Sequence, residues 1–140
     1  MSLKVAQALY QAWIGGDFGL PTAYPNQAFE PIDGVPYAQV YVAGNDTTAK
    51  DLAHTDVTDG VFRVILRYPA NGGAIAGERK SEEIRKYYHI GKRFEYDGQL
   101  VVVRSYSQEP GAPDDGWYKL VLTIRYDADL PRIDKGENNG

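Results

Sequence analysis

Apolar side chains recur at helical spacing in two segments of the chain. In the first segment they lie three and four positions apart and predict one buried helical face: Leu3, Ala6, Leu9, Tyr10 and Trp13. Gly15 and Gly16 follow and can end this helix. A second, charged helix is predicted over residues 74–90, with Gly91 as its stop. Its predicted inward residues are Ile84, Tyr87 and Tyr88. Because glycine costs about 1 kcal/mol relative to alanine inside a helix, Gly77 makes the first turn of this helix doubtful.

Alternation with a period of two predicts the strands. It is clearest over Val61–Tyr68, where every second side chain from Phe62 onward lies on one face. Trp117–Tyr126 alternates in the same way, and Tyr37–Ala43 is a further predicted strand. Asp97-Gly98 stands between two apolar runs and predicts a two-residue hairpin turn.

The remaining segments are predicted to be irregular. Residues 19–36 contain four prolines, each of which removes a backbone hydrogen-bond donor. Residues 44–60 are polar and predict a long flexible loop, and residues 108–115 predict a shorter one. The polar C-terminal segment from Asp127 onward is expected to be disordered.

Together these elements predict an α+β fold. We expect a mainly antiparallel or mixed sheet of four to five strands, with two helices packed on one face. The expected organisation is a single domain over residues 1–128, followed by a flexible C-terminal segment over residues 129–140.

The second face of the predicted sheet mixes apolar and basic residues. On this face Val61, Ile65, Trp117 and Val121 stand among four cations: Arg63, Arg67, Lys119 and Arg125. Such a mixture is typical of a protein contact surface. An ordinary outer face with a few apolar residues is an equally good interpretation.

Composition excludes several classes of protein. The chain has 140 residues, 15 basic and 19 acidic residues, and a net charge of −4, whereas a protein that coats nucleic acid needs a strongly basic surface. No apolar run approaches the roughly 20 residues of a membrane span, and residues 1–13 lack the apolar stretch of a signal peptide. The chain contains no cysteine, which removes disulfides, thiol nucleophiles and cysteine-based zinc sites.

The candidate catalytic and ligand-binding motifs are weak. His54 and His89 are the only histidines, and their spacing does not suggest a metal site. Residues 72–81 resemble a phosphate-binding loop, but the lysine does not follow the second glycine directly. Asp114 and Asp115 stand in a Pro/Gly-rich segment typical of a solvated turn. We therefore predict no enzymatic activity, no cofactor and no metal site.

Three stretches together resemble the tail terminator-like family of bacteriophages and prophages, which is similar to the tail terminator protein of phage lambda. The stretches are Leu20-Pro21-Thr22-Ala23-Tyr24-Pro25-Asn26 with Phe29 and Pro31, Pro36-Tyr37, and Asp115-Gly116-Trp117-Tyr118 followed by Leu120 and Ile124-Arg125-Tyr126. The resemblance covers about residues 3–128.

This resemblance implies a structural protein of the virion tail or neck, assembled in the host bacterial cytoplasm. It implies a ring, expected to be a hexamer, that caps the tail tube, ends tail polymerisation and offers a surface for head joining. The implied partners are further copies of the chain, the tail-tube protein and a head-completion or connector protein. No membrane is implied, and DNA only passes through the lumen.

A heterologous ring needs two different complementary patches on each subunit. Our predicted interface residues are Arg63, Arg67, Lys119 and Arg125 on the sheet face, with Lys50, Asp51 and Asp56 in the polar loop. We expect Asp114 and Asp115 to belong to the acidic patch of the loops. The alternatives are a head-completion protein of the head–tail connector and a small-ligand-binding domain with an aromatic pocket between sheet and helices.

Overall fold

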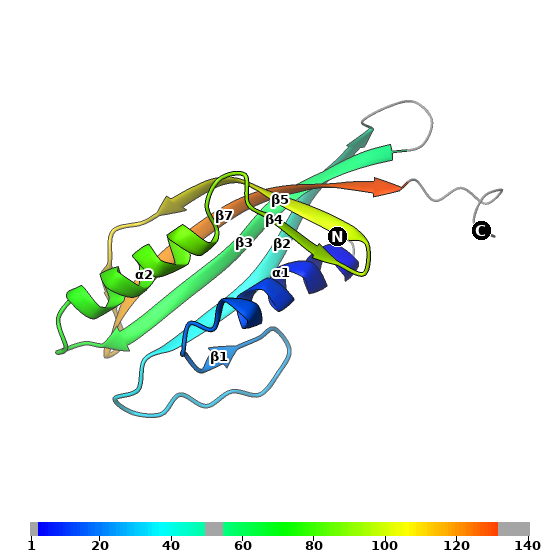
Figure 1. Ribbon diagram of the computed structural model, residues 1–140. Coiled ribbons are helices and arrows are strands. Elements are labelled where there is room, and N and C mark those ends of the chain that lie inside the picture. Colours follow the sequence, from blue (N-terminus) through cyan, green and yellow to red (C-terminus); the bar gives the residue numbers. More distant parts are fainter. Residues whose placement is uncertain (1–2, 50–54, 132–140) are drawn as a thin grey trace.

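The computed structural model describes residues 3–49 and 55–131 (Figure 1). Two helices and seven strands follow one another along the chain. Their bounds are α1 Leu3–Gly16, β1 Thr22–Ala23, β2 Tyr37–Ala49, β3 Thr55–Pro69, α2 Ile75–Tyr87, β4 Arg93–Tyr96, β5 Gln99–Gln108, β6 Ala112–Asp114 and β7 Trp117–Pro131.

All seven strands belong to one mixed sheet with the order β1-β2-β3-β7-β5-β4, and β6 pairs with β7 beside this path. The pairing of β1 with β2 is parallel, and the other pairings are antiparallel. The α+β class was therefore predicted correctly, but the expected four to five strands were too few. The two strands that the sequence pattern missed are the short ones, β1 and β6.

The polar segment over residues 44–60 is the largest correction. Instead of a loop over its whole length, β2 continues to Ala49 and β3 begins at Thr55, and the two pair from Gly44↔Gly60 to Ala49↔Asp56. The register shifts between Gly44 and Thr47, which marks a bulge. Backbone hydrogen bonds build these strands, so an alternating apolar pattern is not needed for them.

Strand β7 is also longer than predicted. It runs to Pro131, and its last residues pair with the start of β3, as in Val57↔Asp129 and Thr55↔Pro131. The predicted disordered segment from Asp127 is therefore wrong for residues 127–131, and residues 132–140 lie outside the described residues. We call residues 44–49 of β2, 55–60 of β3 and 127–131 of β7 the strand extension. It continues beyond the two helices in Figure 1.

Two hairpin turns contain an Asp-Gly pair. One of them was predicted from the sequence and the other was missed. Asp97 and Gly98 have φ values of 50° and 83° and join β4 to β5, as predicted. Asp115 and Gly116, with φ values of 49° and 86°, join β6 to β7. Two consecutive residues with positive φ are typical of the tight turn that matches strand twist. The predicted loop over residues 108–115 is therefore wrong for Ala112–Asp114.

Helix α2 is shorter than the predicted segment 74–90. Its first turn, which Gly77 made doubtful, is helical and packs closely against the sheet. A Cβ on Gly77 would lie 2.6 Å from Leu120 Cδ1 and 3.3 Å from Tyr68 Cδ1. The absence of a side chain therefore lets the helix approach β3 and β7 closely. Glu82 and Arg85, three residues apart on this helix, form an ion pair.

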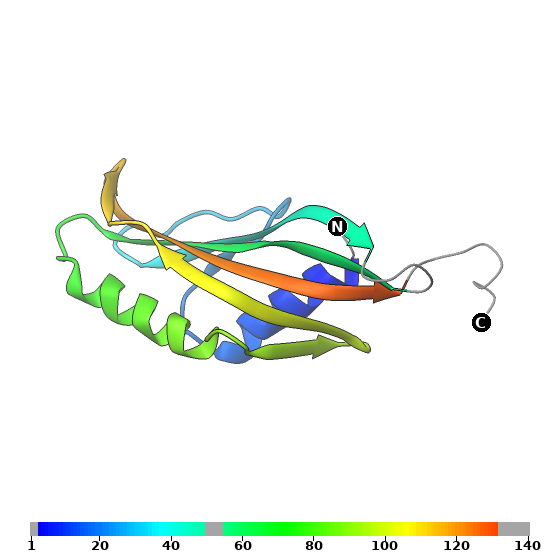
Figure 2. The ribbon, with the colours of Figure 1, turned by 90° about the horizontal axis from the view of Figure 1, so that it is seen from above.

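The core lies between the helices and the sheet, and Figure 2 shows both helices on the same side of the sheet. The aromatic ring of Phe62 in β3 is fully buried. It contacts rings of α1 and of the residue that follows α2. Its centroid lies 6.0 Å from Tyr10 and 6.4 Å from Trp13 of α1, and 5.6 Å from Tyr88, which follows α2. The predicted inward face of Val61–Tyr68 is confirmed, because Phe62, Val64, Leu66 and Tyr68 are all buried.

Candidate functional site

The outer face of the sheet, which is the side away from the helices, carries the predicted interface cations. Strand β3 contributes the odd-numbered residues from Val61 to Arg67, and β7 contributes those from Trp117 to Arg125. The register then places Tyr37, Gln39 and Tyr41 of β2 opposite Arg67, Ile65 and Arg63. Most of these side chains are half-buried, although no helix covers them.

Arg67 is held in place by three neighbouring groups. Its Nε donates to Asp114 Oδ2 at 2.9 Å, and its Nη1 donates to Gln39 Oε1 at 3.0 Å. The guanidinium carbon lies 5.8 Å from the ring centroid of Tyr37, a cation–π distance. The hydrogen bond from Arg67 lowers the pKa of the Asp114 carboxyl, and the charge of Lys119 adds to this effect. Strands β2, β3 and β6 are therefore tied together at this end of the outer face.

Aromatic residues continue this cluster. The ring centroid of Tyr37 lies 5.2 Å from that of Phe29, in the segment between β1 and β2, and 5.1 Å from that of Trp117. The contact with Trp117 is edge-on, a favourable geometry for aromatic pairs. Phe29 thus covers part of the outer face and fixes the proline-rich segment there.

The other three cations are less tightly bound. Arg63 Nη1 donates to Tyr41 Oη at 3.4 Å, and its buried Nε has no hydrogen-bond partner among the described residues. Lys119 stands directly opposite Arg67 on the neighbouring strand. Arg125 is exposed and stands opposite Val61 and Ser105. Positive charge therefore lies beside the half-buried aliphatic residues Ile65 and Val121.

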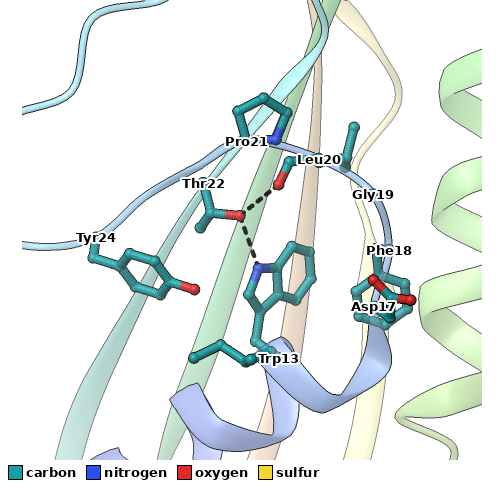
Figure 3. A pocket seen from close by; sticks show the side chains of 9 residues that line it. Trp13, Asp17, Phe18, Gly19, Leu20, Pro21, Thr22 and Tyr24 are labelled. Carbon is teal, nitrogen blue, oxygen red and sulfur yellow. Dashed lines mark hydrogen bonds between the residues drawn. The ribbon is translucent and has the colours of Figure 1, made fainter.

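A hollow of about 280 Å³ lies on a different part of the molecule, between the end of α1 and β1 (Figure 3). Trp13 Nε1 donates to Thr22 Oγ1 at 3.0 Å, and the Thr22 hydroxyl donates to the Leu20 carbonyl oxygen at 3.0 Å. These polar groups on its wall are already paired with each other. Their arrangement favours a structural role in holding the segment after α1.

Within residues 3–49 and 55–131 there is no group of three or more His, Cys, Asp or Glu side chains that could hold a metal ion. None of the helices in the same part of the chain is long and apolar enough to cross a membrane. His89 is exposed, and its Nδ1 lies 3.0 Å from the Ile90 carbonyl oxygen. His54 lies outside the described residues.

Comparison with known proteins identifies the family. A family model described as "Phage tail terminator protein" matches residues 4–126. The chain belongs to this family. It is therefore a structural component of a phage tail, and the resemblance noted in the sequence is confirmed. None of the curated proteins matches the chain.

A solved structure of a protein that carries no functional name has the same fold. It superposes with a TM-score of 0.71 and 22% sequence identity, over 91% of this chain and 94% of that chain. Because the identity is low, this similarity concerns the fold alone.

For this terminator family member, the structure separates the predicted interface residues into groups. Arg63, Arg67, Lys119 and Arg125 do share the outer face, as the alternation predicted. Asp56 lies in β3 rather than in a loop and is half-buried. Lys50 and Asp51 lie outside the described residues.

The expected placement of Asp114 in a separate acidic patch is wrong. Its carboxylate is on the outer face, paired with Arg67. Gln39 and Tyr41 were not predicted to belong to the outer face. Alternation along Tyr37–Ala43 could have placed them there, because every second residue of a strand lies on one face. The Asp115-Gly116 pair was the available signal for Asp114, because a tight turn there folds residues 112–114 back onto β7.

The ion pair between Arg67 and Asp114 predicts a pH-dependent contribution to stability. Because the pKa of Asp114 is lowered on folding, this contribution is fully present above the unfolded pKa of about 3.9 and is lost as the pH falls through the folded value. We expect Asp114→Asn to lower the melting temperature at pH 7, with a smaller difference near pH 3. Thermal melts at both pH values, with Asp115→Asn as control, check this. Equal differences at both pH values would contradict it.

Proposed function

We propose that this protein caps the tail tube as a ring, ends tail polymerisation and provides the surface for head joining. Membership of the tail terminator family is the observation that carries the proposal. In this proposal the protein acts at the neck of the virion, after assembly in the host bacterial cytoplasm. Its partners are further copies of itself, the tail-tube protein and a head-completion or connector protein.

The outer face supports this proposal. A subunit of a closed ring must offer a surface that another protein can cover, and such surfaces combine aromatic, aliphatic and arginine side chains. The outer face has this composition, with Tyr37, Trp117 and Arg67 at one end and Ile65 and Val121 near its middle. The ion pair of Arg67 with Asp114 fixes the strands in place before a partner arrives, which lowers the entropy cost of association.

We keep the predicted interface residues as part of the proposal. Arg63, Lys119 and Arg125 present charge on the outer face, whereas Arg67 acts mainly by holding β2, β3 and β6 together. Asp56, Lys50 and Asp51 belong to the proposed second patch. The expected hexamer is also part of the proposal, because cyclic assembly uses one heterologous contact repeated around the ring.

The net charge of −4 fits a ring through which DNA passes. Binding to the DNA backbone needs several Lys or Arg side chains that neutralise phosphates. A lumen of the same sign as DNA does not retain it. The proposal therefore gives DNA no binding site on this protein and treats it as cargo that moves through the lumen.

Tube polymerisation in vitro tests the proposal. The purified protein is added to polymerising tail-tube subunits, and tube lengths are measured by electron microscopy. We expect one ring at one end of each tube and an arrest of growth at substoichiometric amounts relative to tube subunits. Tubes of unchanged length, without a ring, would contradict the proposal. Binding to the portal or adaptor instead of the tube would favour the head-completion alternative.

A further inference from the structure

Helix α1 exposes a surface that carries no free charge. Its side chains spaced four, four and three residues apart form one side of the helix, which we call the α1 face: Leu3, Gln7, Gln11 and Ile14. Leu3 is 72% exposed and Ile14 is 57% exposed. Lys4 is the only charged residue of α1, and its Nζ lies 3.2 Å from Asp97 Oδ2. The α1 face therefore combines exposed aliphatic ends with an uncharged polar centre.

Helix α2 lies on the same side of the sheet but has a different composition (Figure 2). From Glu78 to Lys86 its exposed residues are all charged: Glu78, Arg79, Glu82, Glu83, Arg85 and Lys86. A charged outer side is typical of a helix that stays in water. Depletion of charge instead marks the part of a surface that another protein covers. Of the two helices, α1 is therefore the one whose exposed side fits a protein contact.

The C-terminal end of the α1 face is acidic. Helix α1 has no basic residue in its last turn, so no side chain of the helix balances the partial negative charge of its terminal carbonyl groups. Asp17 follows, and its backbone N–H donates to the Ile14 carbonyl oxygen at 3.1 Å. Asp17 is exposed, and its carboxylate forms no ion pair within residues 3–49 and 55–131. The nearby Lys80 donates to the Phe18 carbonyl oxygen at 2.7 Å, but its charge is paired with Glu83 at 3.3 Å.

The outer face of the sheet carries charge of the opposite sign. Arg125 is exposed, and it too forms no ion pair in the part of the chain that the structure describes. Arg63 and Lys119 stand on the same face. Between these cations lie Ile65 and Val121, which are half-buried although no helix covers them. The outer face therefore offers apolar area bordered by cations, which complements the aliphatic side chains and the acidic end of the α1 face.

We propose that the α1 face of one subunit packs on the outer face of the next copy, with Asp17 directed at the cations. This inference rests on the proposed ring and names the two surfaces that form its repeated contact, for which Asp56 and its neighbours are not needed. The two surfaces lie on opposite sides of the sheet, as Figure 2 shows for the helices. One subunit can therefore contact two neighbours at once, which is what a head-to-tail contact needs.

A second copy is the occupant that these features favour. Every copy carries both surfaces, so a closed ring covers all of them with one kind of contact. Two α1 faces in contact would bring two Asp17 carboxylates together, and two outer faces would bring their cations together. Like-charge repulsion therefore suppresses both symmetric alternatives. In the proposed contact Ile14 lies against Ile65 and Val121, and apolar area is removed from water on both sides.

Thiol cross-linking tests this contact directly, because the natural chain contains no cysteine. Gln11→Cys on the α1 face and Val121→Cys on the outer face are made as separate proteins. They are mixed in equal amounts, assembled in solution or on tube ends, and treated with a short thiol-specific cross-linker. We expect covalent dimers that join one variant to the other, identified by mass spectrometry. A mixture of Lys86→Cys, on the exposed side of α2, with Val121→Cys is the matched control and should give none.

Three results would overturn the inference. The first is the absence of mixed dimers of Gln11→Cys with Val121→Cys. The second is a yield no higher than that of the Lys86→Cys control. The third is cross-linking of Gln11→Cys only to itself or only to the tube protein, because the α1 face would then contact a different surface.

Ile14→Lys gives an independent test by sedimentation velocity at low salt. A cation near the C-terminus of a helix is favourable for the helix itself, so this variant should stay folded. It places a positive charge against the cations of the outer face and is expected to weaken self-association by roughly tenfold or more. Ile75→Lys on α2 is the matched control, because Ile75 is also exposed, at 64%, and should behave like the wild type. Equal weakening by the two substitutions would contradict the inference.

A second variant tests the partner surface. Arg125→Glu should also weaken self-association, because it places an acid against Asp17. An equal mixture of Arg125→Glu with Ile14→Lys should associate again, since the new lysine then faces the new glutamate and the alternate contacts are native. Failure of the mixture to associate would contradict the inference. Circular dichroism shows whether each variant is folded, and Lys119→Glu replaces Arg125→Glu if that variant unfolds.

The tube-length assay, run in parallel, separates this inference from the proposed function. Protein that arrests tubes without cross-links between Gln11→Cys and Val121→Cys removes only this inference. Wild-type protein that does not arrest tubes removes the proposed function.

Discussion

Phe62→Ala is expected to lower the free energy of unfolding by about 3–5 kcal/mol, the largest loss for any single core truncation considered for this protein. Phe62 is fully buried, and its ring contacts Tyr10, Trp13 and Tyr88. Truncation therefore leaves a cavity where both helices meet β3. Urea unfolding followed by circular dichroism measures the loss, and the melting temperature should fall by roughly 10 °C.

Two controls separate the cavity from a general loss of strand β3. Phe62→Leu keeps most of the volume and should cost about 1.5 kcal/mol or less. The second control is Val61→Ala. Val61 is the neighbouring residue on the outer face, and its side chain is only half-buried. We expect its cost to be clearly below that of Phe62→Ala. Equal costs for Phe62→Ala and Val61→Ala would show that Phe62 does not link the helices to the sheet.

Gly60→Ala is expected to cost about 1–3 kcal/mol by overpacking, although it adds a single methyl group. A Cβ at this position would clash with the Ala43 carbonyl oxygen and would lie 2.6 Å from Tyr126 Oη and 2.9 Å from Gly44 Cα. Two of these three atoms belong to the backbone of β2 and cannot rotate away. The substitution must therefore separate β2 from β3 at the base of the strand extension.

Chemical denaturation measures this cost, and Gly72→Ala is the matched control. A Cβ on Gly72 would meet only the Pro69 carbonyl oxygen, at an ordinary contact distance of 3.5 Å. Its effect should stay within about 0.5 kcal/mol, the usual range for surface positions. A Gly60→Ala protein as stable as the Gly72→Ala control would contradict close packing at Gly60.

The sequence predicted the elements that have one buried face and one face that is less buried. Phe62 to Tyr68 and Leu120 to Tyr126 alternate because helices cover one side of the sheet, so burial selects every second residue. The Asp97-Gly98 turn was equally clear because few other dipeptides adopt its two positive φ values. In these segments local chemistry and tertiary packing require the same residues.

The strand extension was missed because its sequence lacks that pattern. Around Thr58, which is buried although polar, residues 55–60 contain only one aliphatic side chain, Val57. Composition therefore suggested a loop, whereas pairing with both neighbouring strands determines the structure. The partner of Arg67 was missed for a related reason. Asp114 is 47 residues away in the chain, and only the register of β6 with β7 brings it to the guanidinium.

The position of β7 in the sheet has a consequence for how the protein is made. β7 is the last described element, yet it lies between β3 and β5 and pairs with both. Until the ribosome has released residues 117–131, Phe62 and its neighbours on β3 have only β2 as a strand partner, and the outer face lacks Lys119 and Arg125. Pairing over such sequence separations is slow compared with hairpin formation. A nascent chain therefore completes its sheet only after residues 117–131 have left the ribosome.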